Sequence, residues 1–203
     1  MRERINPSRA LLTLAEMQHG VLSNDQADRN GFGRHSVARL VSDGHWRRLG
    51  RGLIFTGRQE PPWLALAWGG ILLGGEASRL GGSAAGYLHQ MLPDPPPEIA
   101  VLVPHGTTLS NVPPWRFAQE RPGIRTRSVR SPPRTSAEDT LLDLCAEMTE
   151  GDAINLLISA VQSRRVAISA LRRRMAARSR VRTATCWKVS CSRWPRESRA
   201  SSS

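Results

Sequence analysis

The chain has 203 residues, with 29 lysines and arginines against 17 aspartates and glutamates, and a formal net charge of +12 at pH 7. The longest apolar run, residues 64–73, is too short to span a bilayer. Three cysteines and an N-terminus without an apolar leader argue against a disulfide framework, a structural zinc site and a secreted protein. We therefore expect a cytoplasmic protein that contacts no membrane.

The positive charge is concentrated in two segments. Residues 172–203 hold ten lysines and arginines and one acid, whereas residues 34–51 hold five arginines and one acid, Asp43. A basic cluster on a short folded segment indicates nucleic-acid binding better than a high total charge does. A solvated charged surface is the alternative interpretation.

Residues 8–31 have the sequence signals of two helices. Ser8 and Gly20 bracket an apolar stretch and predict a helix of roughly ten residues. Ser23 and Gln26 have the spacing of a capping box, which opens a short second helix. Asn30-Gly31 ends that helix.

A third helix and a hairpin follow. In residues 34–42 an apolar stripe at positions i, i+3 and i+4 predicts a helix with one buried face, and Gly44 ends it. Residues 45–56 predict two short strands around a glycine-containing turn. Three helices followed by a basic hairpin is the order of a winged helix-turn-helix, which we assign to residues 1–57.

The third helix offers side chains suited to reading DNA. Recognition helices contact base edges with the residues of their first turns, and arginine can bond both acceptors of guanine. Hairpin arginines would bond phosphates, which positions the domain without reading sequence. We predict base contacts from Arg34, His35, Ser36 and Arg39, and DNA backbone contacts from Arg47, Arg48 and Arg51. A three-helix protein-interaction domain with incidental arginines is the alternative.

Residues 58–182 predict a second, small domain of mixed helices and strands. Helices are expected at 63–73, 78–88, 153–161 and 168–177, and strands at 99–103, 115–119 and 123–129. Thr135-Ser136 is expected to cap a further helix, whose acids Glu138, Asp139 and Asp143 would complement its N-terminus or face water. The predicted fold class is therefore α+β, with the winged helix-turn-helix first.

No motif predicts catalysis. His89 and His105 have no cysteine or acid at metal-ligand spacing, and the glycine pairs lack the arrangement of a phosphate-binding loop. We find no nucleophile triad and no cluster of carboxylates typical of nucleases. The sequence therefore predicts no enzyme, no catalytic residue, no cofactor and no metal site.

The order of these motifs resembles the AbiEi-type antitoxins of type IV toxin–antitoxin systems. The matching stretches are GVLSNDQADRNGFGRHSVARLVSDGHWRRLGRGLIFTG, GGSAAGYL, EIAVLVP and GIRTRSVRSPPRTSAEDTLLDLC. The last is similar to the family's Thr-Ser pair followed by Thr-Leu-Leu-Asp-Leu, here Thr135, Ser136, Thr140, Leu141, Leu142, Asp143 and Leu144. The resemblance implies a winged helix that binds double-stranded DNA at its own promoter. It also implies a second domain that antagonises a nucleotidyltransferase-like toxin without binding it stably.

The chain departs from the family at two places. Gly33 stands where a serine cap is expected, and long relatives continue into a domain like a restriction or mismatch-repair endonuclease. Codons of Cys186, Trp187, Cys191 and Trp194 begin with T, and those of Ser190 and Ser192 usually do. A frame offset by two bases would therefore encode apolar residues at these six positions, which have helical spacing. We hypothesise that residues 183–203 are an out-of-frame, disordered basic tail of a truncated copy, which resequencing of the locus would test.

Four alternatives remain open at this point. Residues 183–203 could be a native basic tail. The chain could be the remnant of a protein with a lost endonuclease-like domain, in which case Mg²⁺-dependent cleavage would reveal it. It could also be a plain winged-helix transcriptional regulator, or a protein-binding module whose basic segment contacts an acidic partner.

Overall fold

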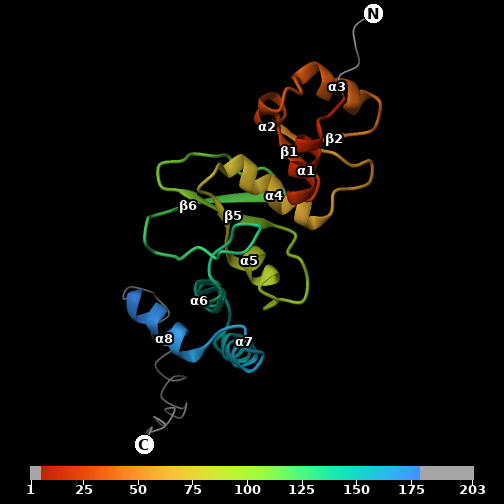
Figure 1. Ribbon diagram of the computed structural model, residues 1–203. Helices are drawn as coiled ribbons and strands as arrows, with labels where there is room; N and C mark the ends of the chain where they lie inside the picture. Colours follow the sequence, from red (N-terminus) through yellow and green to blue (C-terminus); the bar gives the residue numbers. More distant parts are fainter. Residues whose placement is uncertain (1–5, 179–203) are drawn as a thin grey trace, which may run out of the picture. The chain divides into compact units, whose positions relative to one another are not determined.

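The computed structural model describes residues 6–178, which divide into two compact units with the boundary between Ser136 and Ala137 (Figure 1). The first unit holds five helices and two small sheets, and the described part of the second holds three helices. This content confirms the predicted α+β class. The predicted boundary at residue 57 stays a prediction, and the one at residue 182 lies outside the described residues together with the tail.

The N-terminal elements have the arrangement of a winged helix-turn-helix. They are α1 (Arg9–Met17), β1 (Val21–Ser23), α2 (Asn24–Arg29), α3 (Arg34–Ser42), β2 (Arg47–Gly50) and β3 (Leu53–Phe55). The three helices and the hairpin occur where the sequence predicts them. The sequence did not reveal β1, which pairs antiparallel with β3 and gives a sheet in the order β1-β3-β2.

Local hydrogen bonds fix the ends of the first two helices. Ser8 Oγ accepts the Leu11 N–H at 3.2 Å, as an N-cap does. Ser23 and Gln26 form the predicted capping box, with bonds of 3.0 and 3.1 Å. The Gln26 side chain also exchanges two bonds with the buried amide of Gln18. These bonds tie the start of α2 to the end of α1.

A second sheet and two more helices complete the first unit. They are α4 (Trp63–Gly74), β4 (Arg79–Leu80), α5 (Gly82–Leu88), β5 (Ile99–Pro104) and β6 (Trp115–Glu120). The strand order is β4-β5-β6, with β4 antiparallel and β6 parallel to β5. Alternate residues of β5 are buried, as expected for a strand with one face on a core.

Two sequence predictions in this region are wrong in part or in full. The helix expected at 78–88 begins only at Gly82, because residues 79–80 pair with the open edge of β5. The strand expected at 123–129 is absent from the described residues. Arg127 makes an isolated bridge to Thr135, and the segment lies between Pro122 and the pair Pro132-Pro133, which lack backbone N–H donors.

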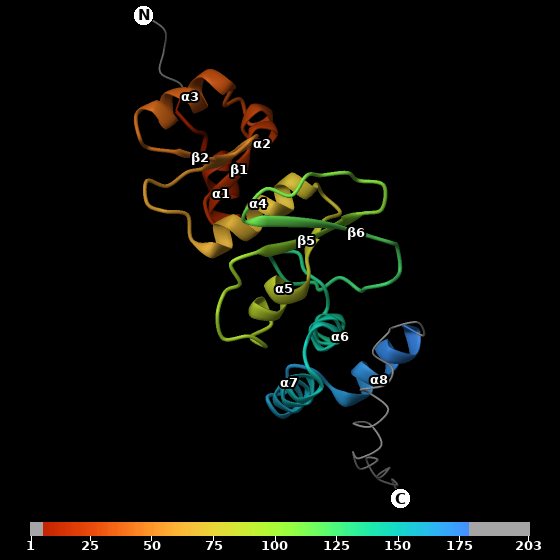
Figure 2. The same ribbon diagram turned by 180° about the vertical axis from the view of Figure 1, so that it is seen from behind.

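Helix α4 lies between the two sheets, a position that both views show (Figures 1 and 2). Gly69 and Gly70 allow this close packing, because a Cβ on Gly70 would lie 2.7 Å from both Trp115 Cδ1 and Val101 Cγ2. The Trp115 indole N–H donates to the carbonyl of Leu66 at 2.6 Å. One buried cluster therefore contains residues of both sheets, among them Val21, Leu53, Phe55, Val101 and Trp115.

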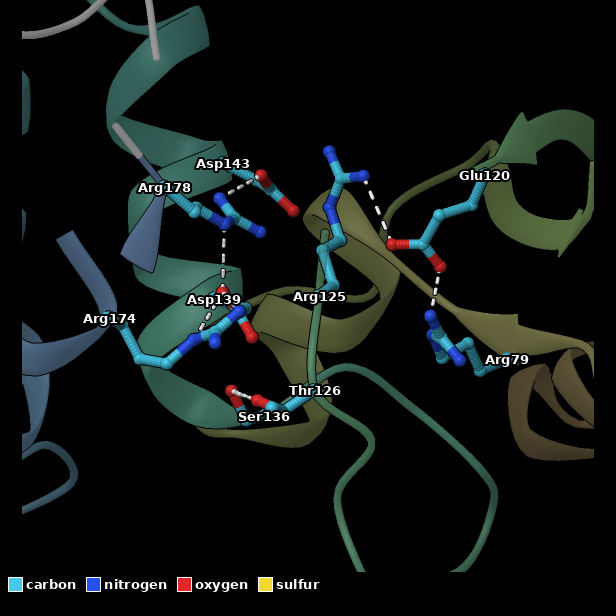
Figure 3. Close-up of polar contacts among 9 residues, drawn as sticks. All are labelled: Arg79, Glu120, Arg125, Thr126, Ser136, Asp139, Asp143, Arg174 and Arg178. Atoms are coloured by element: carbon cyan, nitrogen blue, oxygen red, sulfur yellow. Dashed lines mark hydrogen bonds and ion pairs between the residues drawn. The ribbon is translucent and has the colours of Figure 1, made fainter. Parts of the chain in front are cut away.

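The second unit consists of α6 (Ala137–Glu147), α7 (Glu150–Gln162) and α8 (Ile168–Ala177). Asp139 is fully buried in the first turn of α6. This corrects the expectation that it faces water, whereas its position in the first turn fits the alternative that it complements the helix N-terminus. Its Oδ1 accepts from Arg174 at 3.0 Å and from Arg178 at 2.9 Å, and Arg178 also bonds Asp143 at 2.9 Å (Figure 3). These ion pairs attach α8 to α6.

No helix within the described part of the chain is long and apolar enough to cross a membrane.

Replacement of Gly70 by alanine tests the packing of α4. Although alanine favours a helix by roughly 1 kcal/mol over glycine, the added Cβ would overlap Trp115 and Val101. We expect overpacking to outweigh propensity, with a net loss of about 1–2 kcal/mol in the free energy of unfolding by urea.

Gly151→Ala is the matched control. Gly151 lies in α7, and a Cβ there would meet nothing within 4 Å. This variant should gain roughly 0.5–1 kcal/mol. Equal stabilities of the two variants would contradict the close approach of α4 to Trp115.

Candidate nucleic-acid interface

Helix α3 has one face fixed by the core of the N-terminal elements. Val37 is buried, and Leu40 and Val41 are half-buried against a cluster that includes Leu11 and Phe32. This is the predicted apolar stripe. It determines which side chains α3 presents to solvent, because successive residues on a helix are about 100° apart.

The open face of α3 lies opposite this stripe. By helical geometry it is centred on His35, Arg39 and Ser42, with Arg34 and Ser36 on its flanks. Arg34, His35 and Ser42 are exposed, and Ser36 and Arg39 are half-buried. The four predicted base-contact residues therefore occupy one helix, and two of them share the centre of its open face. The sequence analysis missed Ser42, although its spacing of i+7 from His35 indicates the same face.

The N-terminus of α3 lacks a side-chain cap. Gly33 occupies the N-cap position, and the first turn contains no acid. The first backbone N–H groups of a helix carry partial positive charge and favour an anion. A phosphate oxygen approaching this end would therefore meet the N–H groups together with the guanidinium of Arg34.

The predicted wing arginines do not all lie on one face of the hairpin. Arg47 pairs with Phe55, and Arg48 pairs with Ile54, so their side chains point to opposite sides of the sheet. Arg47 forms an ion pair with Glu60. Arg48 is exposed, as is Arg51 at the turn before Gly52, whose φ of +80° favours glycine. The structure therefore leaves Arg48 and Arg51 exposed to solvent, whereas Arg47 is paired with Glu60.

A further cation lies near the start of the hairpin. Arg58, just after β3, contacts the Nδ1 atom of His45 just before β2, and both residues are exposed. Neither was among the predicted contacts, since Arg58 lies beyond the hairpin in the sequence. Within residues 6–178 no group of three histidines, cysteines or acids could hold a metal ion.

Comparison with known proteins agrees with the geometry of this segment. The sequence model of the family described as "Transcriptional regulator, AbiEi antitoxin" matches residues 9–53. This range extends from α1 to the start of β3, and a regulator of transcription implies a DNA-binding domain. None of the curated proteins matches the chain.

The fold is similar to that of solved structures, among them the crystal structure of the RV2827C protein from Mycobacterium tuberculosis, with a TM-score of 0.51 and 15% sequence identity. The match covers 83% of this chain and 70% of that one. At this identity the likeness concerns the fold alone, and it extends well beyond the N-terminal elements.

The opposite orientations of Arg47 and Arg48 generate a paired prediction for DNA affinity. If Arg48 contacts a phosphate as predicted, Arg48→Ala should weaken binding to every duplex alike and reduce the salt slope of log K by about one. Arg47→Ala should give the smaller change, because Glu60 already pairs with that guanidinium. The measurement is fluorescence anisotropy with two unrelated duplexes over a range of salt concentrations. Equal changes in the two variants would remove the distinction between the faces of the hairpin.

Proposed function

Because residues 9–53 match the AbiEi regulator family, we propose that this chain is the DNA-binding antitoxin and repressor of a type IV toxin–antitoxin system. It binds double-stranded DNA at its own promoter, in the cytoplasm and without a cofactor, and acts by binding rather than by catalysis. It also antagonises a nucleotidyltransferase-like toxin. The observation that carries the proposal is the basic open face of α3, within the segment that the family model matches.

The proposed DNA contacts divide into two classes. Arg34, His35, Ser36 and Arg39 meet base edges in the major groove, since they lie on or beside the open face of α3. Arg47, Arg48 and Arg51 meet phosphates, which fixes the position of α3 on the duplex. Arg47 must leave Glu60 to do so, and its contribution is therefore expected to be the smallest.

The rest of the chain supports a role beyond DNA binding. The family model ends at residue 53, whereas the similarity in fold to the RV2827C protein covers 83% of the chain. In our proposal residues 58–182 form the domain that antagonises the toxin. Residues 1–57 then form the domain that binds DNA, and the two activities belong to different domains.

Arg39→Ala tests base recognition. The side chain lies at the centre of the open face, so its loss should relax discrimination between the operator and a mismatched site by about 1–3 kcal/mol. The measurement is a DNase footprint of the full chain on the DNA upstream of its own gene at two salt concentrations. Arg116→Ala, an exposed arginine of β6 paired with Glu98, is the matched control.

Two results would contradict the proposed recognition. Equal loss of affinity for all sequences would make Arg39 a phosphate contact. A chain ending at residue 182 should give the same bounded footprint as residues 1–203. Binding only by the longer chain, without bounds and lost at the higher salt, would assign DNA binding to the basic tail instead.

Co-expression tests the antitoxin part separately. The full chain is expressed with the product of the neighbouring gene, and growth is measured beside a reporter under the chain's own promoter. We expect rescue of growth and repression of the reporter, and Arg39→Ala should lose repression but keep rescue, because the two activities use different domains. Repression without rescue would identify a plain winged-helix regulator.

A further inference from the structure

A pocket of about 230 Å³ opens in the first unit, away from the residues proposed to contact DNA. It lies at β4, the ends of β5 and β6, and the residues that follow them. Its polar lining residues are Arg79, His105, Glu120 and Arg121, and the remaining wall is aliphatic or proline. The volume is several times the roughly 30 Å³ that one water occupies in the liquid. The pocket therefore has room for a small organic molecule and not only for an ion.

The one acid of the pocket is already neutralised. Glu120 is buried, with its side chain 5% exposed. Its Oε2 accepts from Nη2 of Arg79, and its Oε1 accepts from Nη1 of Arg125 at 3.2 Å (Figure 3). Two guanidinium groups thus face one carboxylate, so Glu120 brings no unbalanced negative charge to the pocket.

Arg79 has donor capacity that Glu120 does not use. Its side chain is 17% exposed, and its Nε is buried without a hydrogen-bond partner within residues 6–178. The exposed part of this side chain, rather than the enclosed Nε, is what a molecule in the pocket can reach. The pairing of β4 with β5 and the bond to Glu120 hold the guanidinium in place at the pocket wall.

The segment beyond the pocket adds further positive charge. Residues 121–136 contain five arginines and no acid. Arg134 is buried there, and its Nη1 donates to the backbone carbonyls of Ser131 and Pro132 at 3.3 and 3.4 Å. Burial, and to a lesser extent the charge of Arg130, lowers the pKa of the Arg134 guanidinium from its ordinary value. Of these five arginines, Arg121 is the one that lines the pocket and adds a positive charge to its wall.

We propose that this pocket binds the phosphate group of a small molecule, with Arg79, Arg121 and His105 as the donors. These three residues line the pocket, and a phosphate dianion accepts more bonds from arginine than a carboxylate can. The aliphatic part of the wall, which includes Leu102 and Val103, gives an organic phosphate a surface to pack against. The site is separate from α3 and the wing, so the proposal does not depend on DNA binding.

Titration of the ¹⁵N-labelled full chain with inorganic phosphate at constant ionic strength tests the site. We expect saturable shifts of backbone amides in residues 77–80, 102–106 and 120–122. Arg121→Ala should weaken the apparent Kd roughly tenfold, since it removes a charge-assisted hydrogen bond. His105→Ala should also weaken it, while Arg116→Ala, an exposed arginine on the same strand as Glu120, should leave it unchanged.

Parallel titrations identify the source of the phosphate. Adenosine monophosphate binding more tightly than inorganic phosphate would identify an organic phosphate as the ligand, and equal affinities would identify free phosphate. Acetate binding as tightly as phosphate would overturn the phosphate assignment. Shifts that do not saturate, shifts confined to α3 and the hairpin, or an equal loss in Arg116→Ala would overturn the site itself.

Discussion

The first unit depends on the packing of Trp115 against the glycine face of α4. The indole occupies the space that side chains on Gly69 and Gly70 would fill, and its N–H bonds the helix backbone at Leu66. The same ring lies within 3.5 Å of the position of a Cβ on Gly50, at the end of β2. One aromatic side chain therefore contacts the second sheet, the connecting helix and the hairpin. One face of the N-terminal sheet is therefore packed against α4 and Trp115 as in a protein interior, and is not exposed to solvent.

This packing has a consequence for the DNA-binding elements. The N-terminal sheet separates two buried clusters, with Val21 and Phe55 on one side and Leu22 and Ile54 on the other. Arg47 is paired with Phe55 and Arg48 with Ile54, and paired residues point to the same face of a sheet. Arg47 therefore lies on the face toward α4, and Arg48 on the face toward α1, α2 and α3. Neighbouring arginines with the same sequence signal consequently have different surroundings, one ion-paired and the other open.

Each unit contains a buried carboxylate that is neutralised by arginines. Glu120 in the first unit and Asp139 in the second are each bonded by two arginines. An unpaired charge would be costly at these positions, whereas two partners and their hydrogen bonds offset the loss of water. In the second unit Arg178 also bonds a second carboxylate, that of Asp143.

The sequence by itself determined the local features of this protein. Ser8, the Ser23 and Gln26 pair, and Gly44 mark the helix ends because capping and positive φ are properties of a few neighbouring residues. The apolar stripe of α3 likewise sets its open face, and with it the candidate site. Only the tertiary structure decided the pairing of β1 with β3, the entry of residues 79–80 into a sheet, and the absence of a strand at 123–129. It also decided that Asp139 is buried and that Arg79 and Glu120 meet. Strand pairing and charge burial depend on partners far away in the chain, and no local pattern encodes where those partners lie.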